Sequence, residues 1–200
     1  GVAEVATGVL REVLFGAPEL HFEIADLDLH LPHDAFFQVN TPGAEVLLQT
    51  IAEAAGSGGS LIDLYCGSGI IGMSLASRFT QVIGIELHDG AIACAQKNAE
   101  ANQVPGRWMA GKVEELLPTL DLPSPRTVVV DPPRVGLHPK AARFISTLDA
   151  DRLVYVACKP ESLRRDADIL AEGGWKLQEI WTVDLFPQTH HVEAVARFIK

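Results

Sequence analysis

Cys158 is the residue of this chain best placed for nucleophilic chemistry. It follows the apolar run 153–157, stands next to Lys159 and precedes a predicted helix. A nearby cation and a helix N-terminus both lower the pKa of a thiol, so we predict a reactive thiolate at this position. Cys66 and Cys94 lack such a setting, and we expect them to pack as small apolar side chains.

Glu193 is the candidate general base. It stands near the start of the last apolar segment, after a polar loop that contains His190 and His191. A carboxylate at such a place is either an exposed edge charge or a positioned acid or base, and the pattern alone leaves both interpretations open. The two histidines could titrate near neutral pH, but exposed loop histidines are commonly inert, so Glu193 is the better candidate.

A glycine-rich turn follows the first predicted parallel strand. Asp63 stands at the strand end, and Gly67, Gly69 and Gly72 come where the chain turns into a helix. Glycines permit positive φ angles and let the backbone approach a ligand. Glu86 ends the next strand, where a carboxylate usually accepts both ribose hydroxyls of an adenosine-containing ligand. Asp63 suits an ammonium group better than a pyrophosphate, which favours S-adenosylmethionine over NAD.

A stiff turn, Asp131-Pro132-Pro133, closes another apolar run at 127–130. Its two prolines fix φ and remove two backbone donors. Open α/β sheets bind their ligands at the carboxyl ends of the strands, so we interpret Asp131 as part of the cofactor site rather than of an ordinary turn.

These residues need a scaffold, and the pattern from about residue 60 onward predicts a Rossmann-like α/β fold. Short apolar runs alternate with longer helical patterns, which is typical of a parallel sheet covered by helices. The loop 184–191 has no room for a crossover helix, so the last two strands should pair antiparallel at one edge of the sheet. The expected strands are 60–65, 81–86, 107–110, 127–130, 153–157, 177–183 and 192–199, and the expected helices lie around 42–55, 70–78, 90–102, 112–119, 138–147 and 161–172. This is a class I methyltransferase variant of the doubly wound fold, with a seven-stranded, mostly parallel sheet, helices on both faces and an antiparallel edge strand.

Length and composition set further bounds. The 200 residues, 48% of them hydrophobic, suit one ordinary domain. The three cysteines are too few and too far apart for a disulfide framework, a zinc site or an iron–sulfur site, so we expect no metal and a reducing, cytoplasmic location. No apolar run reaches the roughly 18 to 20 residues of a membrane span, so we expect no membrane association.

The N-terminal part differs from the rest of the chain. Apolar and polar side chains alternate over 22–31, which predicts a strand or hairpin with one buried face. We expect residues 1–40 to be an extension that leads from an upstream domain, and residues 41–200 to be the catalytic domain. We also expect the protein to be a monomer.

Five motifs occur in order over about residues 22–200, and together they resemble the RNA 5-methyluridine methyltransferases. The motifs are Phe36-Phe-Gln-Val-Asn-Thr41, Asp63-Leu-Tyr-Cys-Gly-Ser-Gly69, Asp131-Pro-Pro-Arg-Val-Gly-Leu137, Ala157-Cys-Lys-Pro160 and Asp184-Leu-Phe-Pro-Gln-Thr-His-His-Val-Glu193. That family has a Rossmann-like fold and uses S-adenosylmethionine to methylate C5 of a uridine in ribosomal or transfer RNA. By position, the resemblance implies four cofactor contacts, which are Gln38, Tyr65, Glu86 and Asp131.

The resemblance also assigns roles to the two candidate catalytic residues. Uracil C5 is a poor nucleophile until a thiolate adds to C6, and Cys158 would make that addition. The resulting enolate attacks the methyl sulfonium through C5. Glu193 would then remove the C5 proton so that the thiol can leave. The enolate oxygen needs a hydrogen-bond donor, and we infer Arg134 or Gln188 for this role.

The chain departs from the family pattern in two places. Ala157 and Lys159 flank Cys158, where the family usually has Ser-Cys-Asn-Pro, so hydrogen bonding around the thiol is expected to differ. Family members also commonly carry an OB-like RNA-binding domain and a central domain, for which this chain is too short, so we expect an excised catalytic domain. The Phe-Phe-Gln-Val-Asn segment is more similar to the ribosomal-RNA members than to the bacterial transfer-RNA type, so ribosomal RNA is favoured and transfer RNA is the alternative.

The distribution of charge indicates a local affinity for RNA rather than a general one. The chain has a formal charge of −10, yet seven basic and only three acidic residues lie between Arg134 and Arg165, around Cys158. This stretch either contacts the phosphates of an RNA whose uridine is flipped into the site, or is a solvated face of Arg and Lys.

Other functions make different demands on the same residues. An RNA 5-methylcytidine methyltransferase would have a cysteine straight after Asp-Pro-Pro, where this chain has Arg134. An exocyclic-amine methyltransferase would have an aromatic residue there and no use for Cys158. A non-catalytic RNA-binding or scaffold module would keep the fold and the cofactor pocket without any reaction at Cys158.

Overall fold

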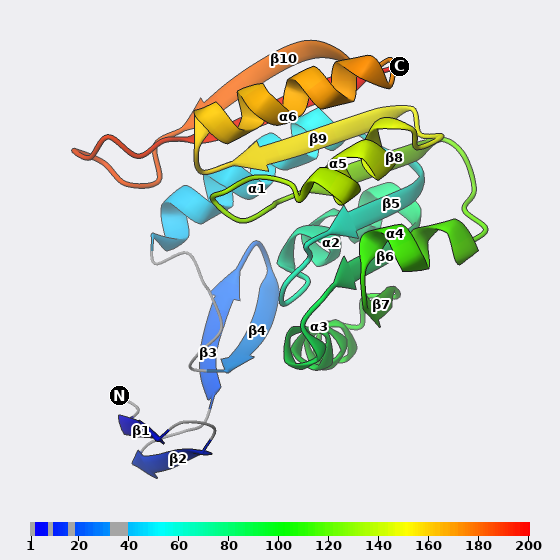
Figure 1. The fold of residues 1–200 in the computed structure, drawn as a ribbon. Coiled ribbons are helices and arrows are strands. Elements are labelled where there is room, and N and C mark those ends of the chain that lie inside the picture. Colours follow the sequence, from blue (N-terminus) through cyan, green and yellow to red (C-terminus); the bar gives the residue numbers. More distant parts are fainter. Residues whose placement is uncertain (1–2, 8–9, 16–18, 33–39) are drawn as a thin grey trace.

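The computed structural model describes residues 3–7, 10–15, 19–32 and 40–200 (Figure 1). Its main element is a seven-stranded sheet in the order β10-β11-β9-β8-β5-β6-β7. The strands are β5 (Gly58–Leu64), β6 (Phe79–Glu86), β7 (Arg107–Ala110), β8 (Arg126–Val130), β9 (Arg152–Ala157), β10 (Lys176–Val183) and β11 (Glu193–Ile199). Neighbouring strands are parallel except at β11, which is antiparallel to both β9 and β10.

The predicted doubly wound fold and the antiparallel pairing of the last two strands are confirmed. In the pairing of β10 with β11, Trp181 lies opposite Val195. The one antiparallel strand, β11, lies one position in from the edge, because it inserts between β9 and β10. The edge strand itself is β10. Each of the seven predicted strands begins and ends within two residues of the observed strand.

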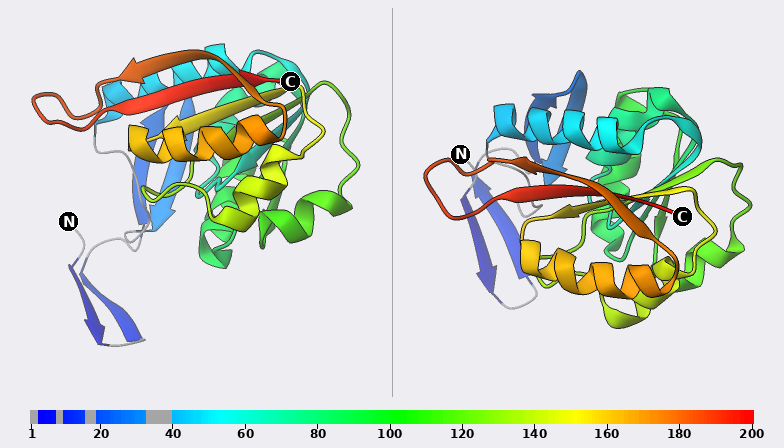
Figure 2. Two further views of the ribbon diagram at one scale, coloured as in Figure 1. Left: turned by 45° about the horizontal axis from the view of Figure 1, so that its top comes forward. Right: turned by 90° about the horizontal axis from the view of Figure 1, so that it is seen from above.

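Helices cover both faces of the sheet, as Figure 2 shows from two directions. One face carries α1 (Thr41–Ala55), α2 (Ile70–Leu75) and α3 (Asp89–Ala101), and the other carries α4 (Val113–Leu116), α5 (Pro139–Ser146) and α6 (Pro160–Glu172). Two 3-10 turns, Ala76–Arg78 and Leu117–Thr119, continue α2 and α4. Within the described residues, no helix is long and apolar enough to cross a membrane.

The central strands bury both of their faces. In β5, Leu61 belongs to the core under α1 to α3, whereas the next residue, Ile62, belongs to the core under α4 to α6. Val129 and Val128 of β8 divide in the same way. Each such side chain contributes about 1.5–3 kcal/mol through burial, which explains why these strands are continuous apolar runs.

The carboxyl ends of β5, β6, β8 and β9 meet at one edge of the sheet because these strands are parallel. The glycine-rich turn follows β5, Asp131 follows β8, and Cys158 follows β9. The loop 184–192 between β10 and β11 extends beyond the same edge (Figure 1). We refer to this end of the sheet as the carboxyl edge and to the opposite end as the amino edge.

Two hairpins precede α1. The strands β1 (Ala3–Thr7) and β2 (Leu10–Phe15) pair antiparallel, as do β3 (Glu19–Ile24) and β4 (Leu27–Pro32). The predicted hairpin around 22–31 is therefore confirmed, with Leu29 fully buried on its apolar face. It packs against α3 through β4. The division of the chain at residue 40 stays a prediction.

Candidate active site

The turn after β5 places its backbone at the carboxyl edge. Tyr65 has φ 62°, an unusual value for a non-glycine residue, and its amide donates to the Ile85 carbonyl of β6 at 2.9 Å. Such strained positions cluster at ligand sites. Gly67 has φ 52°, and a side chain there would meet no described atom within 4 Å. Of the predicted glycines, Gly67 is thus the one that faces open space.

The other two glycines make room for protein atoms. A Cβ on Gly72 would lie 2.9 Å from the ring of Trp108 and 3.0 Å from Oδ2 of Asp63, and a Cβ on Gly69, where φ is 84°, would lie 3.0 Å from the same ring. Cofactor contacts at Gly67 and Gly69 stay predictions. At Gly69 and Gly72 the structure gives a further reason for glycine, since the missing side chains let Trp108 and Asp63 pack beneath the turn.

Asp63 has a buried carboxyl group, and one of its two oxygens has no hydrogen-bond partner among the described residues. Its Oδ2 accepts a hydrogen bond from the Gly72 amide at 2.8 Å, and its Oδ1 has no partner among the described residues. Burial raises the pKa of Asp63 to about 8; the Gly72 bond lowers it, and the charges of Asp131 and Glu86 raise it. A buried, partly unsatisfied carboxyl group is expensive in a structural role, so this position is typical of a ligand contact.

Glu86 ends β6, as predicted, and organises the turn beside it. Its carboxylate accepts from the Gly67 amide at 3.4 Å and from the His88 amide at 3.0 Å. The side chain is partly exposed. A carboxylate has more acceptor sites than these two bonds use, so Glu86 can accept further hydrogen bonds from a hydroxyl-bearing ligand beside Gly67.

Asp131 adds a further carboxyl group to this edge. Its amide donates to the Leu64 carbonyl at 3.3 Å, which brings the end of β8 against the end of β5. Burial and the charge of Glu193 raise the pKa of Asp131 to about 7. Asp63, Glu86, Asp131 and Glu193 thus act on one another as a chain of like charges. Such an arrangement favours a positively charged ligand, which would relieve the repulsion.

Cys158 and Glu193 meet across two antiparallel strands. Where the pairing of β9 with β11 ends, Ala157 lies opposite Ala194, so Cys158 and Glu193 are the next residues at the same end of the two strands. The charge of Glu193 acts on the Cys158 thiol, which places the two groups close together. Glu193 is only 4% exposed, so it is a positioned group and not an exposed edge charge. Burial raises the pKa of its carboxyl group. The pair therefore brings a thiol close to a carboxyl group whose raised pKa makes it a stronger base, the two groups that the predicted chemistry needs.

The prediction that the surroundings lower the pKa of Cys158 is wrong. Burial raises it, the charges of Glu193 and Asp131 raise it further, and Arg134 lowers it. The helix α6 begins only at Pro160, and Lys159 is exposed. The opposing carboxylates outweigh the cation, and neither could be assigned as a neighbour of Cys158 before the strand order was known. The other two cysteines are buried, as predicted.

Of the remaining predicted residues, those that the structure describes lie on two loops, one after β8 and one between β10 and β11. Arg134 is exposed on the loop after β8, near enough to act on Cys158. Gln188 is exposed on the loop between β10 and β11 and has φ 65°. The half-buried His191 and the exposed His190 lie on that loop with ring centroids 4.2 Å apart. Gln38 lies outside the described residues.

Sequence reasoning missed two residues that assemble the site. Asn40 accepts from the Gly43 amide at the start of α1 and donates to the Leu185 carbonyl at 2.9 Å, which joins the start of α1 to the loop before Glu193. Asp166 of α6 is fully buried and accepts from the Leu137 amide at 2.7 Å and from the Tyr155 hydroxyl at 2.6 Å. Its place after an Arg-Arg pair gives no sign of this role.

Asp166 positions the loop that carries Arg134. Its second oxygen accepts from the Arg165 guanidinium, whose Nη2 lies 2.6 Å away. A Cβ on Gly136 would lie 2.7 Å from the Asp166 carboxylate and 2.4 Å from Arg165. The loop from Asp131 to Leu137 is therefore clamped onto α6.

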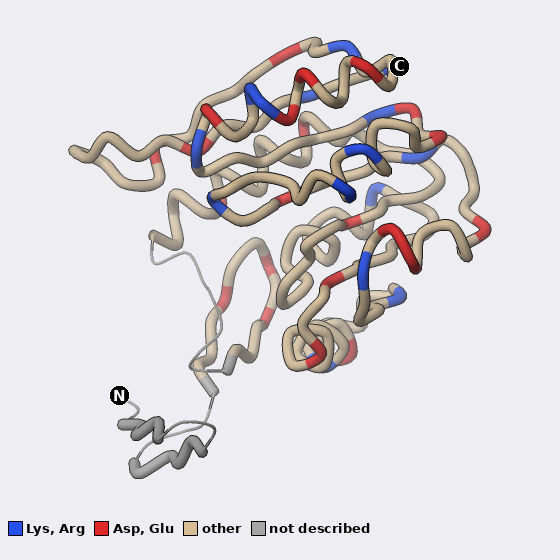
Figure 3. Tube along the Cα trace, in the orientation of Figure 1, with Lys and Arg blue, Asp and Glu red and all other residues tan. Residues whose placement is uncertain are grey.

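The basic stretch is divided between the two ends of the sheet. Figure 3 shows Lys and Arg along α5 and α6, with acidic residues interleaved on α6. Arg152 starts β9 and bonds the Ala55 carbonyl, so it belongs to the amino edge, and Arg165 is paired with Asp166. Lys140, Arg143 and Arg164 are exposed on the helices. Arg152 and Arg165 are therefore not available for phosphate, and fewer than the seven basic residues of this stretch could contact an RNA backbone.

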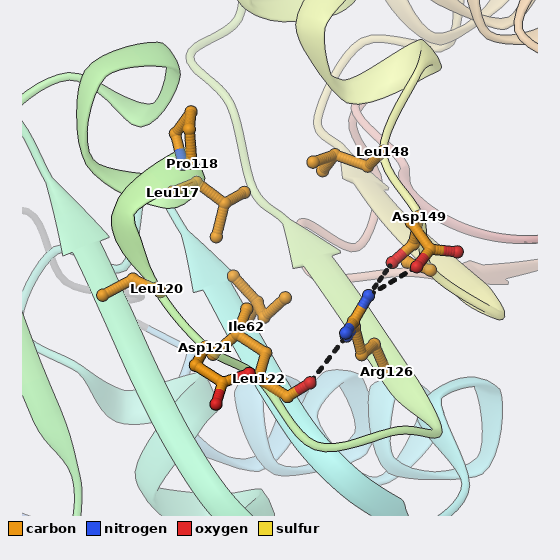
Figure 4. A pocket seen from close by; sticks show the side chains of 10 residues that line it. Ile62, Leu117, Pro118, Leu120, Asp121, Leu122, Arg126, Leu148 and Asp149 are labelled. Atoms are coloured by element: carbon orange, nitrogen blue, oxygen red, sulfur yellow. Dashed lines mark hydrogen bonds and ion pairs between the residues drawn. The ribbon is translucent and has the colours of Figure 1, made fainter.

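A hollow of about 170 Å³ lies elsewhere, at the amino edge (Figure 4). Arg126 reaches across it from the start of β8 and donates to the Leu122 carbonyl at 2.8 Å and to the Asp149 carboxylate at 2.7 Å. Because it lies at the amino ends of the parallel strands and its arginine is already paired with Asp149, this hollow is not the candidate active site.

The chain is similar to known proteins over nearly its whole length. A sequence profile of the tRNA (uracil-5-)-methyltransferase family matches residues 18–116 and 117–199. An uncharacterized RNA methyltransferase of Caldanaerobacter subterraneus is 39% identical over 192 residues, which cover 94% of this chain and 42% of the relative. A protein of the same description from Enterococcus faecalis is 40% identical over 193 residues, with the same coverage. The chain thus spans less than half the length of these relatives.

Solved structures agree with this similarity. The Pyrococcus abyssi tRNA (uracil-54, C5)-methyltransferase, solved with S-adenosyl-L-homocysteine, has a TM-score of 0.80 and 32% identity, and the match covers 92% of this chain and 45% of that one. Pyrococcus abyssi Trm5b has a TM-score of 0.66 at 15% identity, over 99% of this chain and 62% of that one, and shows the fold alone. With its profile match, its relatives and the placement of its motifs at one edge of the sheet, the chain belongs to the RNA uracil-5 methyltransferase family.

Proposed function

We propose that this chain carries the catalytic domain of an S-adenosylmethionine-dependent RNA methyltransferase that modifies C5 of a uridine. The observation that carries the proposal is the cross-strand placement of Cys158 beside the buried Glu193, at an edge lined by further carboxyl groups. Family membership supports it. The assignment of residues 41–200 to this domain, and of residues 1–40 to an extension from an upstream domain, is part of the same proposal.

The carboxyl edge fits S-adenosylmethionine in charge and shape. Asp63 has an unsatisfied buried oxygen, and the pKa values of Asp63 and Asp131 are raised partly by neighbouring negative charges. An ammonium group and a sulfonium group would relieve both conditions. Glu86 stands where a carboxylate accepts ribose hydroxyls, and Gly67 leaves space for the ligand. Tyr65 and, through the family resemblance, Gln38 complete the proposed set of contacts.

When bound, S-adenosylmethionine supplies an electrophilic methyl group. In the proposed mechanism the Cys158 thiolate adds to C6 of the uracil, and the electron pair of the C5–C6 double bond moves into an enolate. The electron pair at C5 then forms a bond to the methyl group as the bond from methyl to sulfur breaks, and the electron pair of that broken bond stays on sulfur, which leaves as a neutral thioether. Glu193 removes the C5 proton, the electron pair of that C–H bond restores the double bond, and the Cys158 sulfur leaves. Arg134 and Gln188 are the proposed donors to the enolate oxygen.

Ionisation of the thiol is coupled to the charges around it. Because burial and the charges of Glu193 and Asp131 raise the pKa of Cys158, the protonated thiol is favoured in the unliganded protein. Arg134 opposes this effect, and a positively charged ligand beside Asp131 would oppose it further. The nucleophile is therefore proposed to form only when the cofactor site is filled.

Ribosomal RNA is the first candidate substrate, because the Phe36–Thr41 motif is more similar to the ribosomal-RNA members. Transfer RNA is a second candidate, favoured by the similarity to the Pyrococcus abyssi tRNA enzyme. Transcripts of both kinds, offered in competition with radiolabelled S-adenosylmethionine, would show which RNA receives the label.

The decisive experiment is trapping with RNA that contains 5-fluorouridine, whose C5 fluorine cannot be removed as a proton. The protein with S-adenosylmethionine should form a methylated covalent adduct that survives denaturation. Cys158→Ala should form none, whereas Cys94→Ser, at a buried cysteine on α3, should react like the original protein. Cofactor binding by calorimetry without an adduct on either RNA, and without methyl transfer, would support a non-catalytic module instead.

A further inference from the structure

The outer face of the β3–β4 hairpin carries a cluster of side chains that the proposed function does not use. Its members are His21, Asp28 and His30, and one ligand atom from each lies within 4.8 Å of the others. His21 and His30 lie directly opposite each other across the hairpin, and Asp28 precedes His30 by two residues on the same face. The cysteine pattern predicts no metal site, but it says nothing of these residues.

Hairpin register brings the three side chains together. The two-residue turn Ala25-Asp26, with φ angles of 50° and 61°, fixes the pairing from Ile24–Leu27 outward. Counting from that closing pair, His21 and His30 form a non-hydrogen-bonded pair, the type in which opposite side chains come closest. Their ring centroids are 4.9 Å apart. The Asp28 carboxylate contacts Nε2 of His21, and its Oδ1 lies 3.9 Å from Nε2 of His30.

Helix α3 holds the backbone of both residues on β4. The Asp28 amide donates to Asn102 at 2.7 Å, and the His30 amide donates to Asn98 at 2.8 Å. The Asn102 side chain also donates to the Asp28 carbonyl at 2.7 Å, and the Cys94 thiol donates to the His30 carbonyl at 3.0 Å. Two side chains of α3, Asn98 and Cys94, and the C-cap residue Asn102 therefore fix the positions of two of the three clustered groups. This placement reduces the entropy that a ligand would otherwise lose in ordering them.

We propose that His21, Asp28 and His30 form a binding site for a divalent transition-metal ion, with zinc as the best-fitting ion. Two imidazole nitrogens and one carboxylate oxygen suit zinc or iron rather than magnesium or calcium. Bond lengths of about 2.0–2.2 Å place tetrahedral zinc ligands about 3.4 Å apart, which rotation of these partly exposed side chains can reach. Water completes the coordination. The ion joins β3 to β4 on a hairpin that α3 holds in place, and its role is structural.

The test is a zinc titration of the full chain, without an affinity tag, against a chromophoric chelator. The starting protein is the Cys158→Ala variant, which removes the one cysteine that is not buried. We expect one equivalent of zinc to bind. His21→Ala and Asp28→Asn should each weaken that binding at least about tenfold. Both side chains are about half exposed, and the bonds to α3 come from the backbone of β4, so both variants should fold, as circular dichroism can verify.

The matched control is the double variant His190→Ala, His191→Ala, which removes another pair of neighbouring imidazoles. It should bind zinc as the starting protein does. Loss of binding in this control but not in His21→Ala would overturn the proposal, as would the absence of a saturable site. Displacement of zinc by millimolar magnesium would also contradict it, because it would indicate an unspecific carboxylate contact. Cobalt substitution gives a second readout, since a nitrogen-ligated tetrahedral site has a visible absorption band that His21→Ala should remove.

Discussion

At the amino edge of the sheet, Arg126 is held by oxygen atoms, whereas at the carboxyl edge several carboxyl groups oppose one another. Arg126 donates to Leu122 and Asp149 at the amino edge. At the carboxyl edge, burial and the charges of Asp131 and Glu86 raise the pKa of Asp63, and burial and the charge of Glu193 raise that of Asp131. Both ends belong to the same sheet, but Asp149 at the amino edge is almost fully exposed, whereas Asp63 at the carboxyl edge is buried. The ion pair at the amino edge holds loops in place. The repulsion between carboxyl groups at the carboxyl edge would be reduced by a positively charged ligand.

The largest effect is expected from the nucleophile at the carboxyl edge. Cys158→Ala should reduce methyl transfer by at least about 10³-fold, because no other group of the proposed mechanism can add to C6. Cofactor affinity should stay unchanged, since Cys158 is not among the proposed cofactor contacts. Transfer of label to RNA and calorimetry measure the two quantities. Normal turnover by this variant would remove the proposed mechanism.

Replacement of the proposed base should give a different defect. In Glu193→Gln, addition and methylation can proceed but proton removal cannot, so turnover should fall about 10²–10⁴-fold while a covalent protein–RNA adduct accumulates. The adduct is measured by a shift in denaturing gels with ordinary, unfluorinated RNA. If the variant turns over slowly without an adduct, while the original protein turns over normally, Glu193 is not the base.

Asp63→Asn tests whether the carboxyl edge is built for a cation. The amide can still accept from the Gly72 backbone but carries no charge, so affinity for S-adenosylmethionine should fall at least about tenfold. The same substitution should also change how the stability of the unliganded protein depends on pH. Because the pKa of Asp63 is about 8 in the folded protein and about 4 in the unfolded chain, the folded state holds an extra proton between these values.

Stability of the unliganded protein should therefore decrease as pH rises from about 4 to 8, and Asp63→Asn should reduce this decrease. Thermal unfolding at pH 5 and pH 8 measures it for both proteins. Asp131, with a pKa of about 7, contributes in the same direction and remains in the variant, so part of the slope should persist. An identical slope in both proteins would show that Asp63 is ionised in the folded state.

A smaller effect is expected on the thiol itself. Bound sinefungin, which carries a protonated amine in place of the sulfonium, should lower the pKa of Cys158 relative to bound S-adenosylhomocysteine, which is neutral at that position. The rate of alkylation by iodoacetamide as a function of pH reports this pKa. The pKa is taken from the pH dependence of the rate rather than from its absolute value, so steric shielding by either ligand does not enter the comparison. Equal pKa values with both ligands would uncouple ionisation of Cys158 from the cofactor.

Most of the fold could be predicted from the sequence, because parallel strands buried on both faces must be short apolar runs. The residues that end these strands, such as Asp131 and Cys158, could be assigned to one edge by the same argument. The surroundings of Cys158 could not be predicted, since the insertion of β11 beside β9 brings Glu193 opposite it. Asp166 was missed for a similar reason, as its partners lie 11 and 29 residues away along the chain.

The smallest effect is expected where charges are already paired. Arg126→Gln removes the bonds to Leu122 and Asp149 at the amino edge, and because Asp149 is almost fully exposed, the ion pair itself contributes little. Most of the loss should come from the bond to the Leu122 carbonyl, about 1 kcal/mol in the free energy of unfolding, measured with urea. Cofactor affinity and methyl transfer should stay within about twofold of the original protein. If Arg126→Gln impaired transfer as strongly as Asp63→Asn, the two edges would not be functionally distinct, and the hollow beside Arg126 would have to be reconsidered as a ligand site.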